Sequence, residues 1–155
     1  MMRKADMKKF KFTLQPLYNY KQTVEKLQKA DLKKAQQALQ ELLDEEARLL
    51  QAYADNERSL ERALRENINV VAALSEHDAY FRFLRDALKE IHERIVKQEE
   101  VVAKCQEKLI ITMKELKTYD KLRNEQYQVY LKEVQAEEDK EMGDLVSFNT
   151  ASGLS

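Results

Sequence analysis

The chain has 155 residues, of which 35% are charged, and it carries a net charge of −1 and no tryptophan. Only two glycines and one proline occur, and the stretch between Pro16 and Gly143 contains neither residue type. This composition excludes a loop-rich globule. Its abundance of leucine, glutamate, lysine, glutamine and alanine predicts an all-α protein built from long helices.

The first predicted element is a helix over residues 14–66, in which apolar side chains recur at alternating steps of three and four. Upstream of Leu32 the same steps occur in a different phase. A phase slip is therefore expected between Leu27 and Leu32, without a break in the helix. The upstream stripe comprises Leu17, Tyr20, Val24 and Leu27, and the downstream stripe comprises Leu32, Ala35, Leu39, Leu42, Leu49, Tyr53, Leu60 and Ala63.

A reversal of the chain is expected over residues 67–75. Asn67, Asn69 and the β-branched residues between and after them weaken a helix locally. Ser75 is a suitable N-cap for the helix that follows. The sequence therefore predicts a turn here rather than one continuous helix.

The second predicted helix covers residues 76–142, and residues 143–155 are expected to form a disordered tail because they contain both glycines and small polar residues. A single heptad phase holds along this helix from Phe81 to Tyr130. Its apolar a and d positions are Phe81, Leu84, Leu88, Ile91, Ile95, Val102, Cys105, Leu109, Leu116, Tyr119 and Tyr130; the exceptions are Gln98, Thr112, Arg123 and Gln126.

Neither helix can bury its apolar stripe alone, and isolated helices gain little stability from propensity. Folding back within one chain buries both stripes, so the prediction is a long two-helix antiparallel coiled-coil hairpin that forms a single domain over residues 1–142. The expected alignment sets Leu60 opposite Arg82 and Phe83, and Tyr20 opposite Leu122. A parallel homodimer without the turn is the alternative arrangement.

The two ends of the chain carry opposite charge. Residues 1–34 contain ten lysines and arginines against three acids, whereas the segment from Glu133 to Glu141 is acidic. A hairpin places these ends side by side, where they attract. Nucleic-acid binding by the basic segment is the alternative, but the segment lacks an arginine-rich or aromatic-interleaved pattern, so no nucleic-acid partner is expected.

No residue pattern predicts catalysis, a metal site or a cofactor. His77 and His92 are too far apart in sequence to form the i, i+4 pair of a helical zinc site, and both are expected to be solvated polar residues. Cys105 occupies a heptad core position and is expected to act as a small apolar residue. The chain is therefore expected not to be an enzyme.

The basic start is followed by no apolar signal segment, and no run of about 18 apolar residues occurs, so a cytoplasmic protein is expected. Phe83, Ile110 and Ile111 lie at outward-facing heptad positions of the second helix. Neighbouring exposed apolar residues are typical of a contact with a partner. We therefore expect this protein to act by binding other proteins.

The opening pattern Phe10-x-Phe12-x-Leu14-x-x-Leu17, followed by a charged helix containing 'AQQAL', resembles the start of the FliJ family of bacterial flagellar export proteins. The stretch 'DKEMGDLV' at residues 139–146 resembles the family's C-terminal signature, from which Gly143 departs. The resemblance covers nearly the whole chain.

The resemblance implies a soluble antiparallel coiled coil, similar to the γ subunit of rotary ATP synthases, that works in the flagellar type III export apparatus at the inner membrane. It implies three partners: the hexameric export ATPase, the cytoplasmic domain of the membrane export gate, and export chaperones. The alternatives are the equivalent stalk of a virulence secretion system and a scaffold without an ATPase partner.

The resemblance also implies where these partners bind. The paired termini would enter the ATPase ring, and the gate would contact the coiled coil. The implied ATPase-binding residues are Phe10, Phe12, Leu14, Leu17, Glu137, Glu138 and Glu141. The implied gate-binding residues are Leu42, Leu49, Tyr53, Phe83 and Ala87. Ile110 and Ile111 are further partner contacts, expected from their outward-facing positions.

Overall fold

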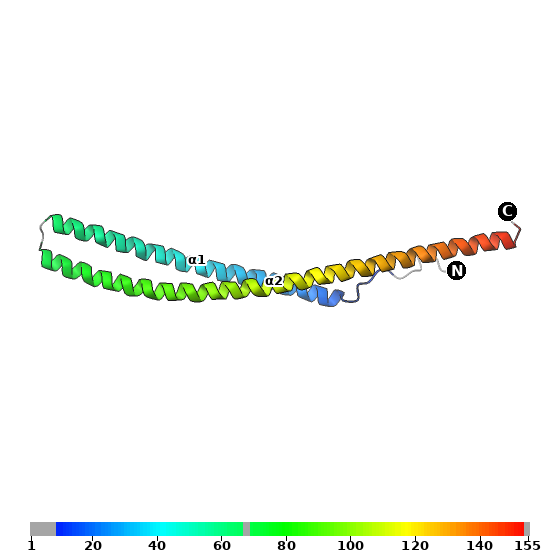
Figure 1. The fold of residues 1–155 in the computed structure, drawn as a ribbon, viewed down its shortest axis with the longest axis horizontal. Coiled ribbons are helices and arrows are strands. Elements are labelled where there is room, and N and C mark those ends of the chain that lie inside the picture. Colours follow the sequence, from blue (N-terminus) through cyan, green and yellow to red (C-terminus); the bar gives the residue numbers. More distant parts are fainter. Residues whose placement is uncertain (1–8, 67–68, 154–155) are drawn as a thin grey trace. The chain divides into compact units, whose positions relative to one another are not determined.

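The computed structural model describes residues 9–66 and 69–153. Helix α1 runs from Gln15 to Arg65 and helix α2 from Val70 to Ala151 (Figure 1). No strand occurs within these two ranges, and the prediction of an all-α helical hairpin is confirmed. Parts of three predicted features, namely the basic start (residues 1–8), the turn (67–68) and the tail (154–155), lie outside the described residues.

The first turn of α1 contains Pro16, which is tolerated there because its missing N–H would have no helical partner. The backbone N–H of Tyr18 donates to the carbonyl oxygen of Leu14 at 2.8 Å, so the helix begins where the sequence predicts.

Helix α2 begins earlier than the sequence predicts. The side-chain oxygen of Asn69 accepts a hydrogen bond from the backbone N–H of Ala72 at 3.3 Å, and its carbonyl accepts from Ala73. Asn69 is therefore the N-cap, and Ser75, the predicted cap, lies inside the helix. The predicted turn at residues 67–75 is correspondingly shorter in the structure.

Helix α2 also ends later than the sequence predicts. It continues through Gly143 to Ala151, and Gly153, with φ +72°, has the left-handed backbone that typically follows a helix end. The hydroxyl of Ser152 donates to the carbonyl of Phe148 at 2.8 Å. The expectation of a disordered tail from residue 143 is therefore contradicted up to Ala151.

Replacing Gly143 by alanine is expected to stabilise this part of α2 by about 0.5–1 kcal/mol, because alanine loses less backbone entropy in a helix. A Cβ at this position meets no atom within 4 Å. Amide hydrogen exchange around residue 143 should slow in Gly143→Ala. The matched control is Gly153→Ala, whose positive φ makes the same substitution unfavourable; equal slowing in both variants would contradict the explanation.

The chain divides into two compact units. The hairpin unit is Leu27–Leu109, and the terminal unit comprises, of the described residues, 9–26 and 110–153. Each unit contains a stretch of α1 and an antiparallel stretch of α2.

The hairpin unit has a mainly apolar seam. Leu84 is only 1% exposed, and Tyr53 of α1 contacts Phe81 of α2 with ring centroids 4.8 Å apart. The predicted alignment would have set Tyr53 opposite Lys89, so α2 is shifted by more than two turns relative to the expectation. The early start of α2 at Val70 is the cause. The buried apolar residues of this unit are Ala35, Ala73, Leu84, Ile91, Ile95, Val102 and Leu109.

The heptad phase predicted for α2 is confirmed by burial. Every a and d position from Phe81 to Tyr130 is buried or half-buried except Arg123. The phase predicted for α1 from Leu32 to Ala63 is confirmed in the same way, and Asn56, a polar d position of that phase, is also buried.

The terminal unit is held largely by aromatic contacts around the segment before α1. Phe12 is 6% exposed and contacts Tyr18 edge-on. Phe10 lies edge-on to Tyr127, with ring centroids 5.1 Å apart, and edge-on to Tyr130, at 5.6 Å. Through these ring contacts, the segment before α1 packs against the start of α1 and against α2.

Candidate partner-binding surfaces

A shallow groove of about 270 Å³ lies between α1 and α2 in the hairpin unit. Ile91, 3% exposed, forms part of its floor, and Phe83, 63% exposed, stands at its edge. Charged side chains of both signs surround the apolar centre. The residues that line the groove are Glu45, Leu49, Phe83, Ala87, Glu90, Ile91 and Arg94.

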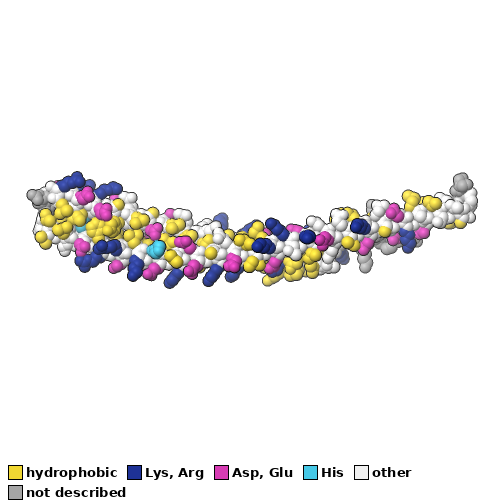
Figure 2. All heavy atoms as spheres, viewed as in Figure 1, with side chains coloured by type: hydrophobic (Ala, Val, Ile, Leu, Met, Phe, Trp, Pro, Cys, Tyr) yellow, Lys and Arg dark blue, Asp and Glu magenta, His cyan; other side chains and the backbone are white. Residues whose placement is uncertain are grey.

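Three of the five implied gate-binding residues, Leu49, Phe83 and Ala87, come together in this groove. Leu42 and Tyr53 are half-buried at heptad core positions and do not line it. The ring of Phe83 also stacks on Tyr80, with centroids 6.3 Å apart. Figure 2 shows apolar side chains gathered near the turn end of this unit, with lysine and arginine side chains around them.

A polar cluster crosses the seam near the turn. The side-chain amide of Asn56, a residue 7% exposed, donates to the carbonyl oxygen of His77 at 3.1 Å. The His77 ring lies 2.7 Å from the carbonyl of Ala73 and 3.2 Å from the hydroxyl of Ser59. His77 is thus half-buried and bonded to both helices, not solvated as predicted.

His92 is exposed, and Cys105 is half-buried in the seam. Among the described residues, no group of three or more His, Cys, Asp or Glu side chains is arranged to hold a metal ion. Nor does any helix in this part of the chain have the length and apolar content needed to cross a membrane.

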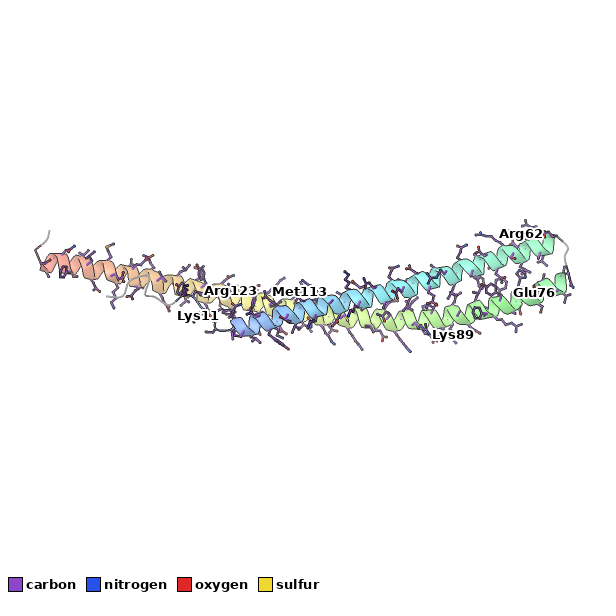
Figure 3. All side chains as sticks on the ribbon, turned by 180° about the vertical axis from the view of Figure 1, so that it is seen from behind. Lys11, Arg62, Glu76, Lys89, Met113 and Arg123 are labelled. Carbon is purple, nitrogen blue, oxygen red and sulfur yellow. The ribbon has the colours of Figure 1, made fainter. Side chains whose placement is uncertain are left out.

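The implied ATPase-binding residues of the N-terminal segment differ in accessibility. Phe12 is buried, and Phe10 and Leu14 are half-buried. Leu17 is 40% exposed. Lys11 and Arg123 lie at a hollow of about 360 Å³ beside Phe12 (Figure 3). Of these four implied residues, only Leu17 offers an exposed apolar side chain to a partner.

Three of the four residues in the apolar stripe predicted to pair the start of α1 with α2 are exposed instead, and the fourth, Val24, is half-buried. Leu17, Tyr20 and Leu27 are all exposed, and Tyr20 is 62% exposed. The phase slip predicted before Leu32 does not occur. Upstream of Leu32, the a and d positions of the downstream phase still face α2, but polar side chains occupy them. The residues in those half-buried positions are Tyr18, Lys21, Glu25 and Gln28.

Specific polar pairs explain this orientation in the terminal unit. The Lys21 ammonium forms an ion pair with Glu115 of α2, and the Tyr18 hydroxyl donates to Asp120 at 2.8 Å. Thr13 and Gln126 also lie within hydrogen-bonding distance, at 3.3 Å. The hydrogen bond to Glu115 raises the pKa of Lys21 above its usual range.

The hydrogen bond to Asp120, followed by burial, raises the pKa of Tyr18 from its ordinary value of 10.0. Because the folded pKa is the higher one, this contact stabilises the fold fully below pH 10.0, and the contribution is lost as pH rises through the raised value. The difference between the ultraviolet titration curves of wild type and Tyr18→Phe isolates the ionisation of Tyr18. This ionisation should occur at a higher pH than that of an ordinary tyrosine. Asp120→Asn should lower the pKa; an unchanged difference titration would contradict the pairing.

The implied acidic ATPase-binding residues lie on α2. Glu137, Glu138 and Glu141 are all half-buried. Beyond them, the stretch predicted to be a disordered tail carries exposed apolar side chains that the sequence reasoning did not single out. Their spacing of three and four residues was the available signal, since it places them on one helical face. These residues are Met142, Leu145 and Val146, with Phe148 nearby.

Ile110 and Ile111 are each 51% exposed, as expected from their heptad positions, and neither lines the groove of the hairpin unit.

The family model described as "Flagellar FliJ protein" matches residues 10–153. Comparison with curated proteins and with solved structures gave no match. The family match covers nearly the whole chain and confirms the resemblance seen in the opening Phe-x-Phe-x-Leu pattern. The chain therefore belongs to the FliJ family of flagellar proteins.

Proposed function

We propose that this chain is a non-enzymatic component of the flagellar export apparatus that binds the hexameric export ATPase as a central stalk. Membership of the FliJ family supports the association with flagellar export. The two-helix fold supports the comparison with the γ subunit of rotary ATP synthases that the resemblance implies.

The terminal unit is the proposed ATPase-binding part. The observation that carries this assignment is the outward position of Leu17 and Tyr20. Here α1 contacts α2 through polar side chains such as Lys21, and its apolar side chains stay exposed. Exposed aromatic and aliphatic residues are the usual anchors of protein interfaces. Glu137, Glu138 and Glu141 of α2 would supply acidic contacts.

Phe10, Phe12 and Leu14 have an indirect role in this proposal. Their side chains are buried or half-buried in the unit. They hold the segment before α1 in place and so shape the surface that the ATPase ring contacts.

The groove of the hairpin unit is the proposed site for the cytoplasmic domain of the export gate. It combines an accessible aromatic ring, Phe83, with the apolar side chains of Leu49 and Ala87. A groove of this size accepts one or two side chains of a partner. Leu42 and Tyr53 would support the groove from the seam. Contact with the gate would hold this otherwise cytoplasmic protein at the inner membrane, where it would also meet export chaperones.

The test is a pull-down and turnover assay with the purified hexameric flagellar export ATPase. Wild-type chain should bind and stimulate turnover. Leu17→Ser/Tyr20→Ser should weaken binding about tenfold, as expected when exposed anchor residues of an interface are lost. Phe83→Ser, matched in chemistry but located in the groove, should stimulate the ATPase normally and lose binding to the gate domain. If wild type neither binds nor stimulates, the stalk assignment is wrong.

A further inference from the structure

In the terminal unit, the face of α2 that points away from α1 carries three lysines at steps of three and four. Lys114, Lys117 and Lys121 are all exposed. Residues at this spacing lie on one side of a helix, so Lys117 and Lys121 repel each other. None of the three forms an ion pair within residues 9–66 and 69–153.

The acids of the same stretch are directed elsewhere. Glu115 pairs with Lys21 of α1, and Asp120 accepts the hydrogen bond of Tyr18. The segment thus places its negative charges toward α1 and its positive charges outward. Between Ile110 and Lys121 the outer face is therefore basic, and exposed acids, Glu107 and Glu125, lie beyond its two ends.

Ile110 and Ile111 continue this face at its N-terminal end, each half exposed. Ile110 precedes Lys114 by four residues, so the two side chains are neighbours on the helix. The seam side of the same turns is already occupied, since Leu109, Thr112 and Leu116 are buried. The outer face therefore combines a small apolar contact with a row of three lysines that form no ion pair among the described residues.

We propose that this face, defined by Ile110, Ile111, Lys114, Lys117 and Lys121, binds an acidic amphipathic helix of another protein. A partner helix with carboxylates at steps of three and four would match the lysine row, and an apolar side chain at its end would cover the two isoleucines. Opposite charges across an interface set the orientation of binding and suppress wrong partners.

A membrane surface fits these observations less well. A helix that lies in a bilayer surface buries a whole apolar face, but the apolar face of α2 is packed against α1 here. Two isoleucines and three lysines remain, which is a weak combination for stable anchoring to anionic lipid. A protein helix needs only a narrow strip of contact.

The probe for this proposal is a fluorescent synthetic peptide that forms an amphipathic helix with a leucine stripe flanked by glutamates. Fluorescence anisotropy with the full-length chain should show saturable binding. Lys114→Glu/Lys117→Glu/Lys121→Glu should weaken it at least tenfold, and Ile110→Ser/Ile111→Ser should weaken it about fivefold. Circular dichroism should be unchanged, because all five side chains are exposed.

The matched control is Lys26→Glu/Lys33→Glu/Lys34→Glu, which makes the same change of net charge at exposed lysines of α1. It should alter peptide binding less than twofold. Absence of saturable binding, or an equal loss in the control, would overturn the proposal. So would a result in which the α2 lysine variant loses binding to phosphatidylglycerol vesicles but keeps its affinity for the peptide. ATPase stimulation should persist in the lysine variants, which separates this proposal from the stalk assignment.

Discussion

Replacing Leu84 by aspartate is expected to unfold the hairpin unit or lower its melting temperature by on the order of 15 °C or more. Leu84 is 1% exposed and lies at a heptad core position of α2. An aspartate there loses the transfer free energy of the leucine and buries a carboxyl group without a partner. The combined cost is about 3–5 kcal/mol or more, a large fraction of the stability of a small unit.

The measurement is thermal unfolding followed by far-ultraviolet circular dichroism, with hydrogen exchange to locate the loss within residues 27–109. Val101→Asp is the matched control, because it makes a similar apolar-to-acid change in the same unit at a side chain 45% exposed. It should change the melting temperature by only a few degrees. Similar melting of the two variants would show that the seam is not the principal source of stability.

Phe12→Ala is expected to release the segment before α1 in the terminal unit. Removing a buried phenylalanine costs about 3–5 kcal/mol through lost burial and the cavity left behind. Phe12 is 6% exposed and contacts Tyr18. The neighbouring contacts of Phe10 with Tyr127 and Tyr130 are too few to hold the segment alone.

Limited proteolysis should detect faster cleavage at residues 9–14 of Phe12→Ala, and the tyrosine ring resonances of this unit should shift in nuclear magnetic resonance spectra. Leu17→Ala is the control, since its side chain is exposed and its loss should leave the segment protected. Protection that persists in Phe12→Ala would mean that Phe12 is not what holds the segment to the helices.

The fold could be predicted because one signal dominates it. Between Phe81 and Tyr119, every a and d position of the predicted heptad phase is buried or half-buried. Long stretches without glycine or proline, together with this phase, leave few alternatives to paired helices.

Details at the helix ends were not predictable from the same signal. Ser75 and Asn69 are both good N-cap residues, and only the structure shows that Asn69 is used. The choice depends on the alignment of α2 with α1, which is a tertiary property. Gly143 was a reasonable helix end by propensity, but its cost of about 1 kcal/mol is small enough for a long helix to continue.

The pairing of the terminal unit was the least predictable feature. Hydrophobicity favours Leu17 and Tyr20 as seam residues, yet Lys21 and Tyr18 face α2. Their partners, Glu115 and Asp120, lie far away in sequence, so no local pattern reveals them. The same limit applies to the proposed ATPase-binding surface, because the spacing of Leu17 and Tyr20 assigned these exposed residues to the seam.

The polar pairs of the terminal unit also fix the alignment of α1 with α2 along the helix axis. An apolar seam tolerates a shift of one heptad, because leucine then meets another apolar residue. A shift in one direction would place the Lys21 ammonium opposite Leu122 in place of Glu115, and a shift in the other would place the Tyr18 hydroxyl opposite Met113 in place of Asp120. Each shifted state would lose an ion pair or a hydrogen bond and would be less stable. These polar contacts therefore select one alignment among those that the hydrophobic residues alone would allow.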